Sequence, residues 1–239
     1  MAPSGYGDRV EGIHAVKAAA RAGRVERLYV EKGRGSRLRD LLALVDESAV
    51  RSIDDVRSVA HTDSPQGVVA ECTPLRPVEL ESMAGEDAAV LILDHVEDPH
   101  NVGAAARSAL AAGATGLVVS GRRAAPLSAA AFKAAAGALE GLPVAIVGSI
   151  PEAMRRLKDL GLWIVGLDSN GGQNLFGLDL LTEPVAMVIG AEGSGLAELT
   201  SKRCDLVVSI PMANGVESLN ASVSAALALF EIMRVRRPR

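Results

Sequence analysis

Short apolar runs alternate with amphipathic stretches through most of the chain, from Ala88 onward. Continuous apolar runs predict buried strands, whereas apolar positions at three- to four-residue steps predict helices. The predicted strands are 90–93, 116–120, 144–147, 163–167, 185–189 and 206–210, and the predicted helices are 99–112, 127–138, 150–160 and a last one that opens at 218–220. This alternation predicts an α/β domain with a parallel sheet and helices on both faces.

The first part of the chain is less regular. Residues 8–21 and 38–45 have helical spacing, whereas 27–31 and 66–71 resemble strands. The stretch that follows contains prolines, a glycine and four acidic residues, which is typical of a turn-forming connection. We therefore expect a small α/β domain at 1–72, a linker at 73–87 and a larger α/β domain at 88–239.

Two of the predicted strands end in loops of small residues. Strand 185–189 is followed by a loop with three glycines and Glu192, and strand 206–210 by Pro211 and the turn cluster 213–215. Glycine lets a backbone turn sharply and approach a ligand closely, and open α/β sheets bind ligands at the carboxyl ends of their strands. Ordinary strand–helix turns would explain the glycines alone, but the pair of loops favours a ligand pocket.

The turn after the first strand of the larger domain excludes one alternative. Segment 94–103 contains one glycine instead of the G-x-G-x-x-G pattern, which disfavours a nicotinamide dehydrogenase. Asp98 is a good N-cap and Pro99 a good first residue, so a helix begins here. Arg107 lies four residues beyond Gly103, so its guanidinium is expected above an open space. For a lone arginine, an ordinary surface position would be the alternative.

Composition indicates a globular protein with an aliphatic core. The chain has 239 residues, of which 49% are hydrophobic and 3% aromatic. Cys72 and Cys204 lack metal-like spacing, so we expect buried free thiols, no metal site and a reducing compartment. Neither a signal-like N-terminus nor a long uncharged apolar run is present, so we expect a cytoplasmic protein without membrane contact.

Charge is distributed unevenly. The net charge of −4 argues against a protein that is basic all over, but segment 17–39 is locally basic. Its charges coincide with glycines that let the backbone approach a phosphate chain, which favours RNA contact over a merely solvated loop. The expected RNA-binding residues are Lys32, Arg34, Arg37 and Arg39. The basic segment 234–239 either binds RNA or complements the dipole of the last helix, and we favour the second interpretation.

Three ordered motifs make the family recognisable. They are D-x-x-x-D-P-x-N-x-G-x-x-x-R at 94–107, I-G-x-E-x-x-G-L at 189–196 and I-P-M-x-x-x-x-x-S-L-N-x-S-V at 210–223. The set resembles the motifs of the SpoU (TrmH) family of RNA 2′-O-ribose methyltransferases, and the resemblance covers essentially the whole chain. Segments 12–16 and 66–69 resemble the ribosomal-protein-like RNA-binding domain of the branch that modifies a 23S rRNA guanosine.

The resemblance implies a SPOUT fold, in which a parallel α/β sheet has its C-terminal part threaded into a deep trefoil knot, and a homodimer. It implies S-adenosylmethionine as the methyl donor, with rRNA as substrate. The positions that match the family's catalytic and substrate-binding residues are Asn101, Arg107, Glu192, Ser218 and Asn220. Those that match its cofactor-binding residues are Leu167, Gly190, Ile210 and Leu219.

The implied reaction is methyl transfer to a ribose 2′-oxygen, with a 23S guanosine as the expected target. The alternatives are a tRNA or antibiotic-resistance rRNA methyltransferase, and a non-catalytic RNA-binding assembly factor. In-line displacement requires the enzyme to align the 2′-oxygen and remove its proton. The family proposal makes Arg107 the general base. Neutralising a guanidinium near pH 8 costs about 8 kcal/mol, so a cationic stabiliser of the alkoxide stays open.

Overall fold

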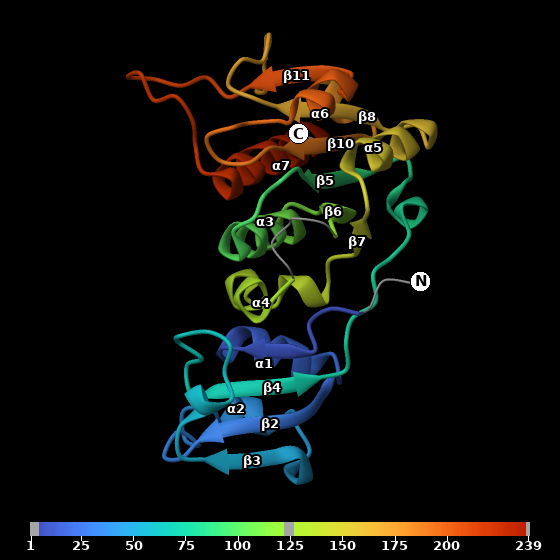
Figure 1. Cartoon of the computed structure of the whole chain (residues 1–239). Helices are drawn as coiled ribbons and strands as arrows, with labels where there is room; N and C mark the ends of the chain where they lie inside the picture. The colour runs from blue at the N-terminus through green and yellow to red at the C-terminus, as the bar shows by residue number, and fades with distance from the viewer. Residues whose placement is uncertain (1–4, 122–126, 238–239) are drawn as a thin grey trace.

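Two sheets stacked along the long axis form the molecule, as Figure 1 shows. The computed structural model describes residues 5–121 and 127–237. The described N-terminal sheet has strand order β1-β4-β2-β3, and the C-terminal sheet has strand order β7-β6-β5-β10-β8-β11-β9. No helix within the described ranges is long and apolar enough to cross a membrane.

The N-terminal sheet is mixed. Its elements are β1 (Arg9–Glu11), α1 (Ile13–Arg21), β2 (Val25–Glu31), α2 (Arg39–Leu42), η1 (Glu47–Ala49), β3 (Val50–Ile53), η2 (Val56–Ser58) and β4 (Val68–Cys72). Strand β4 is antiparallel to β1 and β2, whereas β3 is parallel to β2.

Two sequence predictions in this part of the chain are corrected. The helix predicted at 8–21 begins at Ile13, because Gly12 has a φ of 85° and Val10 pairs with Ala70 in the sheet. Strand β3 was not predicted, since two exposed polar residues separate its two apolar ones. The helix predicted at 38–45 is reduced to α2, while the predicted strand 27–31 is confirmed as part of β2.

The C-terminal sheet is parallel in every described strand pair, which confirms the expected α/β class. Its strands are β5 (Ala89–Leu93), β6 (Gly116–Ser120), β7 (Val144–Val147), β8 (Trp163–Leu167), β9 (Gln173–Asn174), β10 (Val185–Ile189) and β11 (Leu206–Ser209). Its helices are η3 (Leu80–Met83), α3 (Pro99–Ala111), α4 (Ala129–Ala135), η4 (Ala138–Glu140), α5 (Ile150–Asp159), η5 (Asp179–Thr182), α6 (Glu198–Arg203) and α7 (Ala221–Arg236).

Alternate residues of the central strands face two different helical layers. Leu91 and Leu93 pack on the side of α3 and α7, whereas Val90 and Ile92 pack on the side of α5. The predicted helix 127–138 is interrupted after α4, where Ala136 and Gly137 both have positive φ.

The strand order places β8 between β10 and β11. The carboxyl ends of all three strands therefore meet at one edge of the sheet, although they come from separate parts of the chain. Sequence order alone does not reveal this arrangement, because β10 and β11 follow each other along the chain without pairing.

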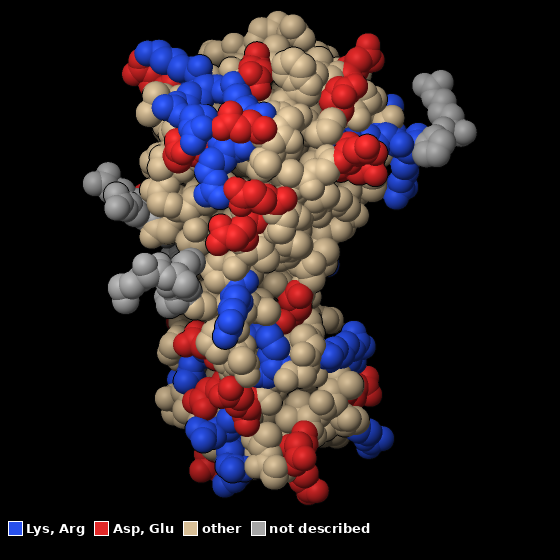
Figure 2. Space-filling model, turned by 90° about the vertical axis from the view of Figure 1, so that its right-hand side faces the viewer, with Lys and Arg blue, Asp and Glu red and all other residues tan. Residues whose placement is uncertain are grey.

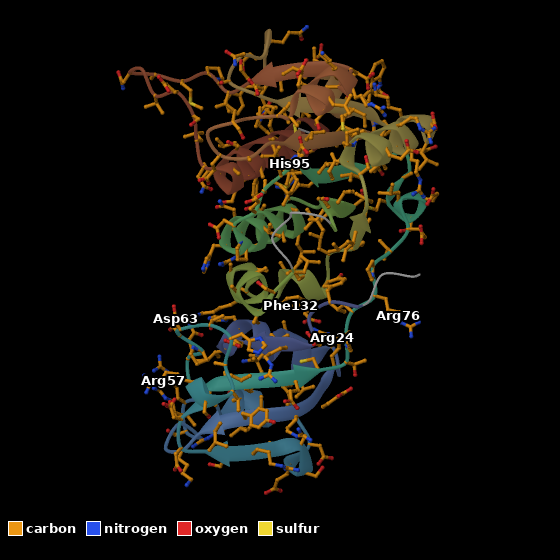
Figure 3. All side chains as sticks on the ribbon, in the orientation of Figure 1. Arg24, Arg57, Asp63, Arg76, His95 and Phe132 are labelled. Atoms are coloured by element: carbon orange, nitrogen blue, oxygen red, sulfur yellow. The ribbon has the colours of Figure 1, made fainter. Side chains whose placement is uncertain are left out.

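A continuous apolar core connects the two sheets. Residues of α1, β2 and β4 belong to the same buried cluster as residues of α3, α4 and α7. At the junction, Phe132 of α4 lies 6.2 Å from the ring of Tyr6 and 6.0 Å from the guanidinium carbon of Arg24 (Figure 3). The N-terminal sheet is thus packed directly onto α4.

Candidate functional site

A pocket lies at the carboxyl edge of β8 and β10, closed by the segment that leads from β11 to α7. All four expected cofactor residues, Leu167, Gly190, Ile210 and Leu219, line this pocket. The expected residues Glu192 and Ser218 line it too, and the prediction missed Asp168, Ser169, Met212, Glu217 and Ser224. The insertion of β8 between the other two strands brings the first two of these to the pocket.

Glu192 is the centre of a hydrogen-bonded cluster at the mouth of the pocket. Its Oε1 atom accepts a hydrogen bond of 2.8 Å from Asn101 Nδ2 and another from Asn220 Nδ2. The backbone N–H of Ala221 donates to the same oxygen at 3.3 Å. The two amides also contact each other, since Asn220 Nδ2 donates to Asn101 Oδ1 at 2.8 Å. Among the described residues, Glu192 Oε2 has no hydrogen-bond partner.

The two asparagines of this cluster are held by helix starts. Asn220 is the N-cap of α7, and its Oδ1 accepts from the backbone N–H of Ser222 at 2.9 Å. Asn101 lies in the first turn of α3, where the predicted cap is confirmed: Asp98 accepts from the His100 N–H at 2.9 Å. The first turns of two helices far apart in the sequence therefore carry the amides that bind Glu192.

Two carboxylates that the sequence analysis did not select fix the Glu192 loop. Asp94 is buried at the end of β5, and its Oδ2 accepts from the Ala197 N–H at 3.2 Å. Asp168 Oδ2 accepts from the Leu196 N–H at 3.4 Å. The position of Asp94 as the first residue of its motif was the available signal for its role.

The glycines of the loop allow it to fold onto itself. A Cβ atom on Gly190 would lie 2.1 Å from the carbonyl oxygen of Gly195, so a side chain cannot be accommodated there. Gly193 has a φ of 77°, with open space where its side chain would be. The sharp turn predicted from the sequence is confirmed, and it presents Glu192 at the tip.

Arg107 does not join the cluster within one chain. It is exposed on α3 and lines a separate hollow with His14 and Leu110, and its side chain has no hydrogen bond or ion pair within the described residues. The expected open space above Gly103 is wrong: a Cβ atom on Gly103 would lie 2.3 Å from the Ala131 carbonyl oxygen, because α3 packs closely on α4.

The expected RNA-binding residues are divided between two environments. Arg34 and Arg37 line one hollow of the N-terminal sheet together with His14 and Arg57, which the sequence analysis did not select. Lys32 and Arg39 do not line this hollow. Lys32 forms an exposed ion pair with Asp54, with 2.7 Å between Nζ and Oδ1.

Neither cysteine is a reactive group. Burial raises the pKa of the Cys72 thiol to about 12 and that of Cys204 to about 11, so both stay protonated at neutral pH. Both thiols are free, as predicted, although Cys204 is half-buried. Within 5–121 and 127–237, no group of three or more His, Cys, Asp or Glu residues is placed to hold a metal ion.

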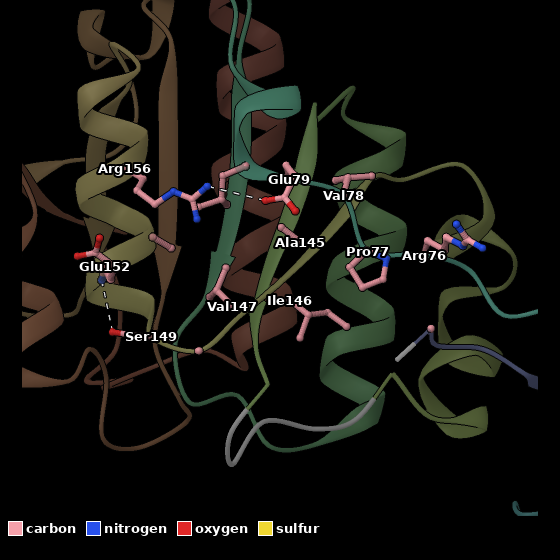
Figure 4. Close-up of a pocket in the computed structure, with 14 residues that line it drawn as sticks. Arg76, Pro77, Val78, Glu79, Ala145, Ile146, Val147, Ser149, Glu152 and Arg156 are labelled. Atoms are coloured by element: carbon pink, nitrogen blue, oxygen red, sulfur yellow. Dashed lines mark hydrogen bonds and ion pairs between the residues drawn. The ribbon is translucent and has the colours of Figure 1, made fainter. Parts of the chain in front are cut away.

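A larger hollow of about 790 Å³ lies away from the cluster, along edge strand β7 (Figure 4). Most of its charged side chains are paired among themselves or with neighbours, whereas the exposed Arg76 has no partner among the described residues. Arg156 contacts Glu81 at 2.6 Å and Glu79 at 3.9 Å, and Ser149 Oγ caps α5. This hollow therefore offers a ligand few free polar groups.

Two family models together match most of the chain. Residues 88–230 match the SpoU rRNA methylase family, and residues 9–78 match the RNA 2′-O ribose methyltransferase substrate-binding family. The chain belongs to the SpoU rRNA methylase family. The resemblance found in the three motifs is thereby confirmed, and with it the enzyme class, an rRNA 2′-O-ribose methyltransferase.

Two relatives that match nearly the full length of this chain are also named as methyltransferases. The chain is 40% identical to the 23S rRNA (guanosine-2′-O-)-methyltransferase RlmB of Nitrosomonas europaea, over 95% of this chain and 92% of the relative. The SpoU methyltransferase AviRb of Streptomyces viridochromogenes, solved in complex with the cofactor AdoMet, is 30% identical with a TM-score of 0.80, over 95% of this chain and 89% of that chain.

A smaller relative matches one part of the chain. A structure solved to study 2-OH methylation of C/U34 on tRNA is 25% identical with a TM-score of 0.54 and covers 62% of this chain and 95% of that chain. Since the family and a full-length neighbour with bound AdoMet agree, the expected cofactor, S-adenosylmethionine, is confirmed as well.

Proposed function

We propose that this enzyme methylates the 2′-oxygen of one guanosine ribose in 23S rRNA, in the bacterial cytoplasm where that RNA is found. The observation that best supports this proposal is the Glu192 cluster. It places a carboxylate at the mouth of the pocket, and one oxygen of that carboxylate has no hydrogen-bond partner among the described residues. The named activity of the Nitrosomonas europaea relative, which matches this chain over nearly its full length, supports the guanosine of 23S rRNA as the target.

The lining of the pocket suits the chemistry of S-adenosylmethionine. Leu167, Ile210 and Leu219 provide apolar walls for a flat ring, and the carboxylates of Asp168 and Glu217 are at hand for hydroxyl and cationic groups. When bound, this cofactor supplies a methyl group on a positively charged sulfur. The protein then has to bring the ribose 2′-oxygen in line with that methyl group and to accept its proton.

The residues around the pocket have separate roles in this reaction. Asn101 and Asn220 saturate Glu192 Oε1, which fixes the carboxylate and leaves Oε2 to accept a hydrogen bond from the substrate. Ser218 lines the pocket nearby and orients the substrate. Arg107 either accepts the proton or stabilises the developing alkoxide as a cation. The second role avoids the cost of neutralising a guanidinium.

A homodimer would unite Arg107 with the cluster. Arg107 lines a different hollow from Glu192 of its own chain, which supports a site to which a second copy supplies the arginine. The segment from Pro211 to Ser218 is exposed throughout and extends from the body in Figure 1, which supports a partner surface there. On α7, Val223 and Phe230 are 45% and 41% exposed.

The finer architecture follows the same family pattern. We infer a deep trefoil knot in the C-terminal part, as membership of the family implies. The end of α7 is held in place by Arg236, whose guanidinium donates to the carbonyls of Leu181 and Asp87 at 2.9 and 2.8 Å. We also infer a ribosomal-protein-like RNA-binding domain at 1–72, a linker at 73–87 and the methyltransferase domain at 88–239. Sheet order and the ranges of the two family matches support this division.

The alternatives are less well supported. The structure from the tRNA study covers 62% of this chain. A tRNA methyltransferase of that size would not account for the N-terminal sheet. A non-catalytic assembly factor would not require the carboxylate–amide cluster that is built here from three separate segments.

The decisive experiment follows labelled methyl from S-adenosylmethionine into unmodified 23S rRNA, 16S rRNA and tRNA. The expected product is one site in 23S rRNA that resists alkaline cleavage, because a methylated 2′-oxygen cannot attack the neighbouring phosphate. Label in tRNA alone would contradict the proposal, as would cofactor binding without transfer to any of the three RNAs.

Subunit complementation tests the shared site. Arg107→Ala and Asn220→Ala chains are each inactive in this proposal, but a mixed dimer has one site with both residues intact. Random exchange of equal amounts should restore about a quarter of wild-type activity, since half of the dimers are mixed and each has one good site. Activity that stays at the level of the separate variants would contradict a site shared between chains.

A further inference from the structure

Two neighbouring hollows meet at the junction of the sheets, and His14 lines both. One, of about 600 Å³, is formed by the N-terminal sheet and contains Arg34, Arg37 and Arg57. The other, of about 460 Å³, lies between α1 and the α3–α4 pair and contains Arg107. Both volumes fall in the range of about 300–1,000 Å³ in which proteins bind organic groups. The hollows therefore form one surface that leads to Arg107.

This surface carries positive charge that the chain does not neutralise. The side chains of Arg37 and Arg107 form no hydrogen bond or ion pair with the described residues, and both are exposed. The acidic residue of the lining that is likewise without a partner among the described residues is Asp63. Arg34 and Arg57 have acidic partners, at 2.5 Å from Glu31 and 2.8 Å from Asp55. A chain of phosphates would supply the missing negative charge.

The opposite side of the molecule is more evenly charged, as far as the structure describes it. On the face drawn in Figure 2, basic and acidic side chains are intermixed. The cations of α5 are paired, with Arg155 at 2.6 Å from Glu152 and Lys158 at 2.7 Å from Asp205. The hollow along β7 is lined by two arginines and two acidic residues, whereas the two hollows of the junction are lined by four arginines and two acidic residues. Charge therefore favours the junction.

The floor near Arg107 suits a flat base. It consists of small residues of α1, α3 and the α4–η4 turn: Ala18, Ala111, Ala135, Ala136, Gly137 and Ala138. The exposed imidazole of His14 stands at the border of the two hollows. Unpaired RNA bases stack on aromatic side chains, histidine included, so His14 supplies the ring that the basic loop at 32–39 lacks.

The walls of this surface are fixed relative to each other. Arg24, beside β2, makes two bonds across the junction to Glu140 of η4, with Nε to Oε2 at 2.8 Å and Nη2 to Oε1 at 2.5 Å. Both side chains are at least nine-tenths buried. Lys133 of α4 also donates to the Ser64 carbonyl, and a Cβ atom on Gly7 would lie 2.2 Å from the Phe132 ring.

We propose that the junction is a binding site for the single RNA strand that flanks the target ribose. The strand lies along the two hollows, with a base on His14 and a phosphate at Arg37, and so reaches Arg107 of the same chain. This inference rests on the proposed function and assigns His14 as a substrate-binding residue beside Arg37.

Binding of a short fluorescein-labelled single-stranded RNA, followed by anisotropy over a range of salt concentrations, tests the site. His14→Ala should raise Kd about fivefold, the loss of one stacked base. Arg37→Ala should lower the slope of log K against log salt by about 1. With unmodified 23S rRNA, both variants should raise KM and leave kcat unchanged. Arg51→Ala, an exposed arginine on β3 that does not line the hollows, is the matched control.

His14→Tyr should restore the affinity lost in His14→Ala, because it returns an aromatic face. The proposal would be overturned if both alanine variants kept the wild-type Kd, salt slope and KM. It would also be overturned if His14→Tyr bound the RNA as weakly as His14→Ala. Cofactor affinity, measured by calorimetry, verifies that each variant is folded. Since RNA binding is measured without methyl transfer, failure of this site is separable from failure of the proposed reaction.

Discussion

Three donors converge on a single oxygen of Glu192, and the other oxygen is left free. A carboxylate held in this way has one orientation in the empty pocket, so substrate binding does not have to order it. Hydrogen bonds to a charged group contribute about 1.5–3 kcal/mol each, and Asn101 is buried, so water cannot replace it easily.

Asn101→Ala should therefore lower kcat for methyl transfer about tenfold or more, because Glu192 and Asn220 both lose a partner. Cofactor affinity should change little, since Asn101 does not line the cofactor pocket. Steady-state kinetics with rRNA and calorimetry with S-adenosylmethionine measure the two effects. His100→Ala, a change at the exposed neighbouring residue, is the control, and an equal loss in that variant would contradict a specific role for Asn101.

Glu231 makes the stability of the folded chain depend on pH. Hydrogen bonds from Arg234 and from the Gly177 N–H hold the pKa of its carboxyl below the ordinary value. A lowered pKa stabilises the folded chain at neutral pH, and this contribution disappears as pH falls from about 4.3 through the folded-state pKa. Thermal melting between pH 7 and pH 3 should show a loss for the wild type that Glu231→Gln lacks, amounting to a few degrees. Equal losses of melting temperature in the wild type and in Glu231→Gln over this pH range would contradict this assignment.

At the level of elements, the sequence predicts that a helix or strand exists better than it predicts what packs around that element. Strand β7 and the start of α3 are predicted to the residue, because an apolar run and an Asp-Pro cap are local signals. Strand β1 is missed, since its one apolar residue, Val10, continues the helical spacing of α1 until Gly12 breaks it. The neighbourhood of Arg107 is not predictable from helix geometry alone, because it depends on how closely α4 packs against Gly103.

Helix α7 shows the same limit. In the sequence, Leu219, Val223, Leu227 and Phe230 recur at three- to four-residue steps, but the structure buries Ala221, Ala225, Ala228, Leu229 and Ile232 instead. Val223 and Phe230 are exposed. A helix with apolar residues on two sides needs two partners, and a single chain provides one.

Phe230→Glu should convert the proposed homodimer into monomers, because it introduces a charge into the exposed side of α7. Sedimentation velocity measures the change, and methyl transfer should fall with it. Trp163→Glu is the matched control, since Trp163 is 46% exposed at the start of β8, away from α7. A Phe230→Glu protein that sediments like the wild type would exclude this face as the interface.

For the whole molecule, the junction between the sheets contains a buried ion pair in addition to its apolar core. Glu140→Ala would leave Arg24 buried without its carboxylate and should destabilise the chain by about 3 kcal/mol. Chemical denaturation should show the lower midpoint. Arg155→Ala, which breaks exposed ion pairs on α5, should leave the midpoint almost unchanged. Equal losses in the two variants would mean that the junction contributes no more than a surface pair.

The position of β8 between β10 and β11 also has a consequence for biosynthesis. The pocket needs the ends of β8 and β10 and the start of α7, and these segments are made one after another along the chain. While the N-terminal sheet and β5 to β7 can already be folded on the ribosome, the walls of the pocket are incomplete until residues 206–236 have emerged. A nascent chain therefore lacks a complete pocket for the methyl donor until this last segment has folded.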